Sequence, residues 1–225
     1  MPIDWSPLWL SLRVAAISTL VSVVLGVALA WLLAHSRFRG RDFLDAAVML
    51  PLVLPPTVLG YYLLVLLGRE SALGHLYEML FGQPLVFTWQ AAVVAAMFHS
   101  LPLLVKWSRS ALESVDHSYE WAARSLGASE WRTFWRVSLP LAGRSIAAAA
   151  ALSFARALGD FGVTIMIAGN IPGQTQTVSV AIYDAVESGN GALARTLVVV
   201  VSLVAVVILT LANRISRPES AEAAK

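Results

Sequence analysis

The stretch from residue 113 to 143 reads ESVDHSYEWAARSLGASEWRTFWRVSLPLAG and lies between two strongly apolar runs. Ser118 can cap a first short helix in this stretch, and Gly127 permits the turn that ends it. Ala122, Ala123 and Leu126 fall on one face of that helix, where the small alanines would let another surface approach closely. The pattern therefore predicts an amphipathic helix with a contact face.

A second short helix is predicted in the same stretch. Trp131, Phe134 and Trp135 form its apolar stripe, and Pro140 is expected to end it because proline lacks a backbone donor. Amphipathicity by itself favours a helix that lies on lipid headgroups. The two interpretations are separated below by the spacing of the motif.

The composition is that of a membrane protein. Hydrophobic residues make up 58% of the 225 residues and charged residues only 13%, whereas soluble domains have roughly 25% charged residues. There are no cysteines, which excludes disulfides, thiol catalysis and cysteine-bound metals. The net charge of +2 does not indicate a nucleic-acid partner.

Five apolar runs are long enough to cross a bilayer as helices, because about 20 apolar residues span its core. They cover residues 8–34, 43–67, 85–105, 145–168 and 196–212. The expected fold is thus an all-α membrane protein with one transmembrane domain over residues 1–215. The small, polar residues 216–225 are expected to form a disordered tail.

Lysine and arginine predict the orientation of these spans, since they favour the cytoplasmic side. Basic residues follow the first, third and fifth spans: Arg37, Arg39, Arg41, Lys106, Arg109, Arg124, Arg132, Arg136, Arg144, Arg214, Arg217 and Lys225. The other side carries only Arg69 and Arg195. The N-terminus is therefore expected outside, and the C-terminus and the segment 113–143 inside.

Two spans contain residues that are unusual in lipid. The second span carries Pro55, Pro56, Thr57 and Gly60, and its prolines free backbone groups that a neighbouring helix or a water-lined path must satisfy. These residues are candidates for a transport pathway. A structural kink that fits neighbouring helices is the alternative, and the prolines alone favour neither.

The fourth span carries Arg156 and Asp160, with Gly162 beside them. A charge at the bilayer centre costs about 2.5–3.5 kcal/mol, so such residues generally face the protein interior or a water-filled path. They are pathway or gate candidates. The alternative is a mutual i,i+4 ion pair that only stabilises the fold. His99 is interpreted as a packing residue, and no spacing predicts a metal site.

The spacing of the 113–143 stretch resembles the EAA motif of ABC-importer permeases: Glu-Ala-Ala, three residues, Gly, nine residues, Ile, one residue, Leu-Pro. The matching residues are Ala122, Ala123, Gly127, Leu139 and Pro140. Val137 replaces the isoleucine, and Trp121 replaces the glutamate, with an acid one residue earlier at Glu120. The resemblance implies a coupling helix, including Glu120 and Leu126, that docks into a separate cytoplasmic ATPase.

Three further segments, LPLVLPPTV, ARALGDFG and GNIPGQTQT, resemble the molybdate-transport permeases. Asp160 stands where a glutamate is expected. The resemblance covers nearly the whole chain and implies a type I importer fold in the bacterial inner membrane. It also implies import of molybdate, and often tungstate, delivered by a periplasmic or lipid-anchored binding protein. Sulfate permeases are near relatives, so another oxyanion is the alternative substrate.

The chain is not expected to be an enzyme. It has no G-x-x-x-x-G-K-[ST] loop, so ATP and magnesium are expected on the partner ATPase, with no cofactor in this chain. Five helices are few for a sealed pathway, which favours a homodimer with the pore on its two-fold axis. An ion-coupled secondary transporter is the rival from another class, but no internal repeat supports it. No motif supports an intramembrane hydrolase.

Overall fold

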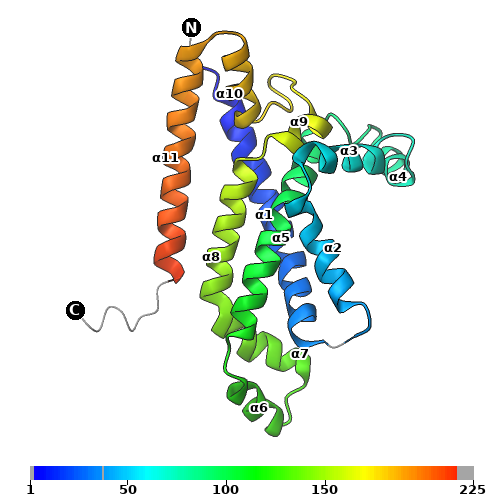
Figure 1. Ribbon diagram of the computed structural model, residues 1–225, viewed down its shortest axis with the longest axis vertical. Coiled ribbons are helices and arrows are strands. Elements are labelled where there is room, and N and C mark those ends of the chain that lie inside the picture. Colours follow the sequence, from blue (N-terminus) through cyan, green and yellow to red (C-terminus); the bar gives the residue numbers. More distant parts are fainter. Residues whose placement is uncertain (1–2, 37, 217–225) are drawn as a thin grey trace, which may run out of the picture.

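The computed structural model describes residues 3–36 and 38–216 and consists of helices and their connections over that range (Figure 1). The all-α prediction is confirmed. The predicted tail, residues 216–225, lies outside the described residues except for Ser216, the last residue of a helix. Its disorder therefore stays a prediction.

The helices follow one another along the chain with short connections. They are α1 (Ser6–His35), α2 (Arg41–Val53), α3 (Pro56–Leu67), α4 (Ala72–Phe81), α5 (Trp89–Glu113), α6 (His117–Ser125), α7 (Glu130–Thr133), a π-helical turn (Phe134–Ser138), α8 (Leu139–Leu158), α9 (Gly162–Ala168), α10 (Val178–Glu187) and α11 (Gly191–Ser216).

The centre of the molecule is a bundle in which α5 packs against both α1 and α8. Small residues line these contacts, among them Ala15, Ala92 and Ala96, all buried. Small side chains let transmembrane helices approach closely, where dispersion and packing replace the hydrophobic effect as the source of stability. On α11, Val199, Leu203 and Val207 remain exposed, as lipid-facing positions are.

Among the described residues, four helices are long and apolar enough to cross a membrane, and the α2–α3 pair makes a fifth span if counted as one. That pair differs from the straight helix predicted over residues 43–67. The chain bends by 114° between α2 and α3, at Leu54 and Pro55, which are extended. Pro56 removes a further donor, so the ladder of helical hydrogen bonds stops there.

The fourth span also differs from its predicted bounds of 145–168. A continuous apolar helix runs from Glu130 to Leu158 through α7, the π-helical turn and α8, and α9 is a separate helix. Pro140 lies in the first turn of α8, where a missing donor is tolerated. The expectation that Pro140 ends the preceding helix is wrong, because the π-helical turn passes directly into α8.

The two interrupted spans meet at their breaks. A Cβ atom added at Gly162 would lie 2.6 Å from Cβ of Pro56, and one added at Gly60 would lie 2.6 Å from Cβ of Met166. Real Cβ atoms do not approach so closely, so only glycine fits at either position. The packing of α3 on α9 therefore depends on these two glycines.

Candidate functional site

Helix α6 projects from the end of the bundle opposite α4 and α10 (Figure 1). Its N-cap is Asp116, whose side chain accepts a hydrogen bond from the backbone N–H of Ser118 at 2.8 Å. The prediction that Ser118 caps the helix is therefore wrong by two residues. At the other end, Gly127 adopts a φ of +83°, the left-handed conformation that ends a helix and favours glycine.

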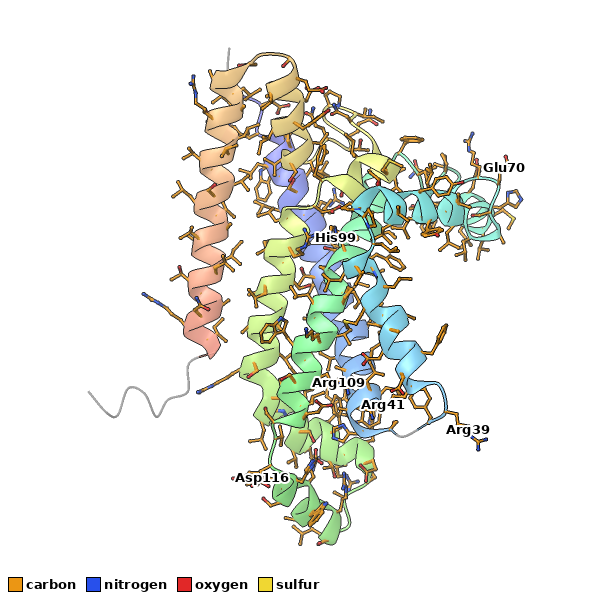
Figure 2. All side chains as sticks on the ribbon, viewed as in Figure 1. Arg39, Arg41, Glu70, His99, Arg109 and Asp116 are labelled. Atoms are coloured by element: carbon orange, nitrogen blue, oxygen red, sulfur yellow. The ribbon has the colours of Figure 1, made fainter. Side chains whose placement is uncertain are left out.

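The tip of α6 presents apolar side chains to solvent. Leu126 is 90% exposed, Trp121 is largely exposed, Ala122 is exposed and Ala123 half-buried. Figure 2 shows basic side chains at the same end of the molecule, among them Arg39, Arg41 and Arg109. An exposed apolar tip outside the bundle is typical of a contact surface for a partner.

Glu120 points the other way, into the protein, and is 2% exposed. Its Oε1 accepts a hydrogen bond from the Ser138 hydroxyl at 2.6 Å and lies 3.2 Å from Nε2 of His35. Glu120 therefore ties α6 both to the C-terminal end of α1 and to the π-helical turn. Its carboxylate is inside the protein, unlike the exposed residues of the predicted coupling set.

The contacts of Glu120 favour its ionised form. Burial raises the pKa of the carboxyl, but hydrogen bonds from Ser138 and His35 outweigh burial and leave the pKa below its ordinary value. Arg124 and His117 lie 3.5 and 3.4 Å from the other carboxylate oxygen. Buried carboxylates are retained when they are paired and hydrogen-bonded in this way.

An aromatic cluster joins α7 and the π-helical turn to α1. The rings of Trp31 and Phe134 lie 5.3 Å apart, and Trp131 packs edge-on against Trp31 at 6.3 Å. Leu139 packs against the same buried cluster, whereas Pro140 is exposed. Within the predicted motif, the residues after Gly127 thus serve mainly to seat α7 and the start of α8 against α1.

The pathway candidates of the second span lie at its bend. Pro55, Pro56 and Thr57 are exposed, whereas Gly60 is buried against α9. Gly162 lies directly across from Pro56. The structure brings these residues of the two interrupted spans together, and leaves the proline side of the bend accessible.

Arg156 and Asp160 form a polar cluster with His99 of α5, which Figure 2 labels inside the bundle. Nδ1 of His99 lies 2.6 Å from Oδ1 of Asp160, and Arg156 bonds to Nε2 of the same ring. Asp160 also accepts hydrogen bonds from the backbone and the hydroxyl of Thr164. Among the described residues, the ion pairs include none directly between Arg156 and Asp160; the imidazole joins them instead.

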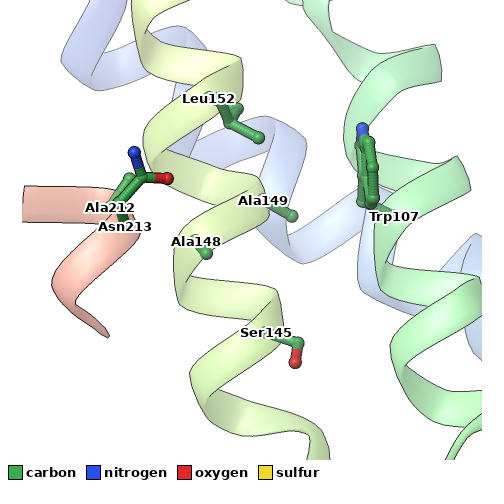
Figure 3. A pocket seen from close by; sticks show the side chains of 7 residues that line it. All are labelled: Trp107, Ser145, Ala148, Ala149, Leu152, Ala212 and Asn213. Atoms are coloured by element: carbon green, nitrogen blue, oxygen red, sulfur yellow. The ribbon is translucent and has the colours of Figure 1, made fainter. Parts of the chain in front are cut away.

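A pocket of 220 Å³ lies between α5, α8 and α11 (Figure 3). It is lined by Trp107, Ser145, Ala148, Ala149, Leu152, Ala212 and Asn213. None of these seven lining residues is a cation, so the pocket lacks the charged donors that an oxyanion would need.

Comparison with known proteins decides the class of this molecule. The model of the family described as "Binding-protein-dependent transport system inner membrane component" matches residues 22–218. The chain belongs to this family. The permease is thus an inner-membrane transport component and not a catalytic subunit, which confirms the resemblance seen in the motif at residues 113–143.

Individual relatives agree with that assignment. The permease is 42% identical to the molybdenum transport system permease protein ModB of Escherichia coli, over 92% of this chain and 91% of that protein. It is 38% identical to the "Probable sulfate transport system permease protein cysT" of Chlorella vulgaris, over 94% of this chain and 79% of that protein. A structure of the MetNI methionine ABC transporter has the same fold, with a TM-score of 0.74, 19% identity and coverage of 94% and 93%.

Sequence reasoning missed three residues that hold these sites together. His99 was interpreted as packing, because its partners lie 57 and 61 residues away in the sequence. Ser138 and His35 carried no signal either, because only the folded chain brings them to Glu120. The one available hint was that His99 is a titratable side chain inside an apolar run, which generally needs a polar partner.

Proposed function

We propose that this permease forms the pathway by which an ATP-driven importer carries molybdate, and with it tungstate, across the inner membrane. The observation that carries the proposal is the similarity just described. The relative named for molybdenum transport is both more identical and more completely covered than the one named for sulfate transport. Sulfate is therefore the second candidate substrate.

The energy source in this proposal is a separate ATPase, which binds ATP and magnesium and docks on α6. Two features support this. Leu126 and Trp121 are exposed at the tip of α6, and Glu120 fixes the base of the helix to α1 and the π-helical turn. A helix with an exposed apolar tip and an anchored base can transmit a push from its partner to the bundle.

The translocation pathway is proposed to lie between two copies of the permease, because one bundle of about five spans is too small to enclose it. A binding protein on the outer side would deliver the anion. The interrupted spans supply the residues proposed to line or gate the path: Pro55, Pro56, Thr57, Gly60, Arg156, Asp160 and Gly162. Their clustering at two helix breaks supports this, since irregular backbone at membrane depth is tolerated where it lines a cavity.

An ion-coupled secondary transporter would need no ATPase, so assembly discriminates between the two classes. The permease should copurify with its ATPase, and binding protein loaded with molybdate should stimulate ATP hydrolysis. The sharpest variant is Gly127→Leu, which adds bulk at the tip of α6, where an added Cβ meets nothing within 4 Å. We expect it to lower the stimulation by obstructing the docking surface.

Gly82→Leu is the matched control. Gly82 ends α4 with a φ of +70° and also has nothing within 4 Å of an added Cβ, so the backbone strain is the same but lies far from α6. Equal activity of the two variants would contradict docking at α6. An ATPase that never assembles with the wild-type permease would contradict the importer itself, and stimulation by sulfate alone would change the substrate.

A further inference from the structure

The His99 cluster connects four separate pieces of backbone at one point. His99 belongs to α5, Arg156 to α8, Asp160 to the connection before α9, and Thr164 to α9. His99, Asp160 and Thr164 are each less than 10% exposed, and Arg156, half-buried, is the least enclosed member. Any movement of α8 relative to α9 must therefore strain or break a hydrogen bond in this cluster.

The chemistry of the side chains determines where the protons are. A guanidinium only donates hydrogen bonds, so Nε2 of His99 must accept from Arg156 and carry no proton. The ring proton then resides on Nδ1 and is donated to Oδ1 of Asp160, 2.6 Å away. His99 is thus a neutral imidazole between a cation and an anion, and the resting cluster has no net charge.

The cluster also lies at a place built to bend. Helix α8 ends at Leu158, Gly159 is its exposed C-cap, and α9 starts at Gly162. Across from this break is the 114° bend of the second span, which Gly162 contacts through Pro56. A change of angle at residues 159–161 would move Arg156 away from Asp160 and Thr164 without disturbing either helix internally.

We propose that Arg156 is a transit contact for the oxyanion, held at rest by His99, which Asp160 orients, and freed when residues 159–161 bend. In the freed state the guanidinium donates to the passing anion instead of to the imidazole, and arginine forks match oxyanions well. His99 and Asp160 are positioning residues: the imidazole accepts a hydrogen bond from the guanidinium, and the carboxylate of Asp160 balances its charge when no anion is present. The inference rests on the proposed function as an oxyanion importer.

The absence of cysteine from the chain makes a direct test possible. In Gly159→Cys the new Cβ would lie 3.7 Å from its nearest neighbour, which is ordinary contact. The thiol is labelled with an anionic and a cationic methanethiosulfonate reagent, and the ratio of the two rates reports the local charge. The permease is assembled with its ATPase and binding protein in lipid, either without nucleotide or trapped with ATP and vanadate.

We expect the anionic-to-cationic rate ratio to rise on trapping by at most roughly fivefold to thirtyfold, the limit set by one full unit charge acting oppositely on the two reagents across about 8 Å at an effective dielectric of about 40 to 80. Arg156→Gln should abolish the rise. Arg156→Lys keeps the positive charge, so it should keep the rise, and it controls for any effect on assembly of substituting Arg156. Gly143→Cys, on the same helix and with nothing within 4 Å of its added Cβ, should show no rise.

Two further variants test the role of His99. His99→Leu removes the acceptor of Arg156, so the ratio should already be high at rest. His99→Gln should restore the low resting value, because an amide can accept from Arg156 and donate to Asp160 at once. A merely structural role for His99 would instead make the two variants alike, and that result would overturn the assignment.

Other outcomes separate this inference from the proposed function. The transit contact would be overturned if the anionic-to-cationic rate ratio did not rise on trapping, if Arg156→Gln left that rise unchanged, or if the thiol never reacted. This would hold even if molybdate were imported. If Arg156→Gln fails to assemble, the single variants Gly159→Cys and Gly143→Cys decide the question. A rise of the rate ratio on trapping in Gly159→Cys but not in Gly143→Cys supports the inference, and any other result overturns it. A rise that depends on Arg156, found in a complex that molybdate does not stimulate, would support the contact and overturn only the proposed substrate.

Discussion

Leu126 offers the most direct measure of how strongly α6 binds a partner. Its side chain is 90% exposed, so almost all of its apolar surface is available to be buried on docking. Fully burying a leucine side chain contributes about 1.5–3 kcal/mol. Leu126→Ala retains only the Cβ atom and should lose about 1–2.5 kcal/mol of that, which corresponds to roughly 5- to 70-fold weaker binding.

The assay is the dissociation constant of the purified ATPase for the permease held in lipid nanodiscs. Leu126 makes few contacts within its own chain, so the variant should fold and insert as the wild type does. Leu80→Ala is the control, since Leu80 is also largely exposed, at 69%, but lies on α4 at the opposite end of the bundle. It should leave the dissociation constant unchanged.

Two results would refute the reasoning. An equal dissociation constant for Leu126→Ala and the wild type would mean that the tip of α6 stays exposed in the complex. An equal loss for Leu126→Ala and Leu80→Ala would mean that the effect comes from general destabilisation rather than from docking. Neither result can be reconciled with α6 as the contact surface.

Three further predictions concern the supports of the two sites. Glu120→Ala leaves the Ser138 hydroxyl and the His35 ring without their acceptor, so the anchoring of α6 should weaken by about 1–3 kcal/mol. Faster amide exchange over residues 117–126 would reveal it, and Glu78→Ala, at a carboxylate of α4 that pairs with Arg69 away from α6, should not accelerate that exchange. Because the folded-state pKa of Glu120 is below its ordinary 4.5, its stabilising contribution is complete above that pH and is lost as the pH falls through the folded value. Amide exchange of α6 measured from pH 7 downward should therefore show no loosening caused by this carboxyl until the pH is below about 4.5. Loosening centred near neutral pH in the wild type, and absent from Glu120→Gln, would contradict this prediction. Gly162→Ala should destabilise the α3–α9 contact by about 1–3 kcal/mol through overpacking against Pro56, seen as a lower melting temperature. Gly159→Ala should be tolerated, because its added Cβ would lie 3.7 Å from its nearest neighbour.

The sequence predicts the membrane-spanning helical fold well, because hydropathy depends on local composition. It also predicts a short helix between Ser118 and Leu126 that ends at Gly127, since capping and turn residues act locally. The interruptions were harder to predict. Prolines at 55 and 56 indicate a break, but its angle of 114° depends on the packing of Gly60 and Gly162 against their neighbours.

The polar contacts within the sites could not be predicted from local patterns. The i,i+4 spacing of Arg156 and Asp160 allows a direct pair, but α8 ends at Leu158, so the two residues no longer share a regular helix. His99, from a helix far away in the sequence, takes the position between them. Similarly, Glu120 is on the predicted coupling helix but points inward, because Ser138 and His35 offer it donors that the exposed face lacks.

The most direct test of the central claim is uptake of radiolabelled molybdate into proteoliposomes that contain the permease, its ATPase and its binding protein. The account predicts accumulation against a gradient that requires ATP, and that is reduced by Leu126→Ala but not by Leu80→Ala. Accumulation driven by a proton or sodium gradient without ATP would contradict the account, as would a fully assembled complex that hydrolyses ATP yet imports no oxyanion.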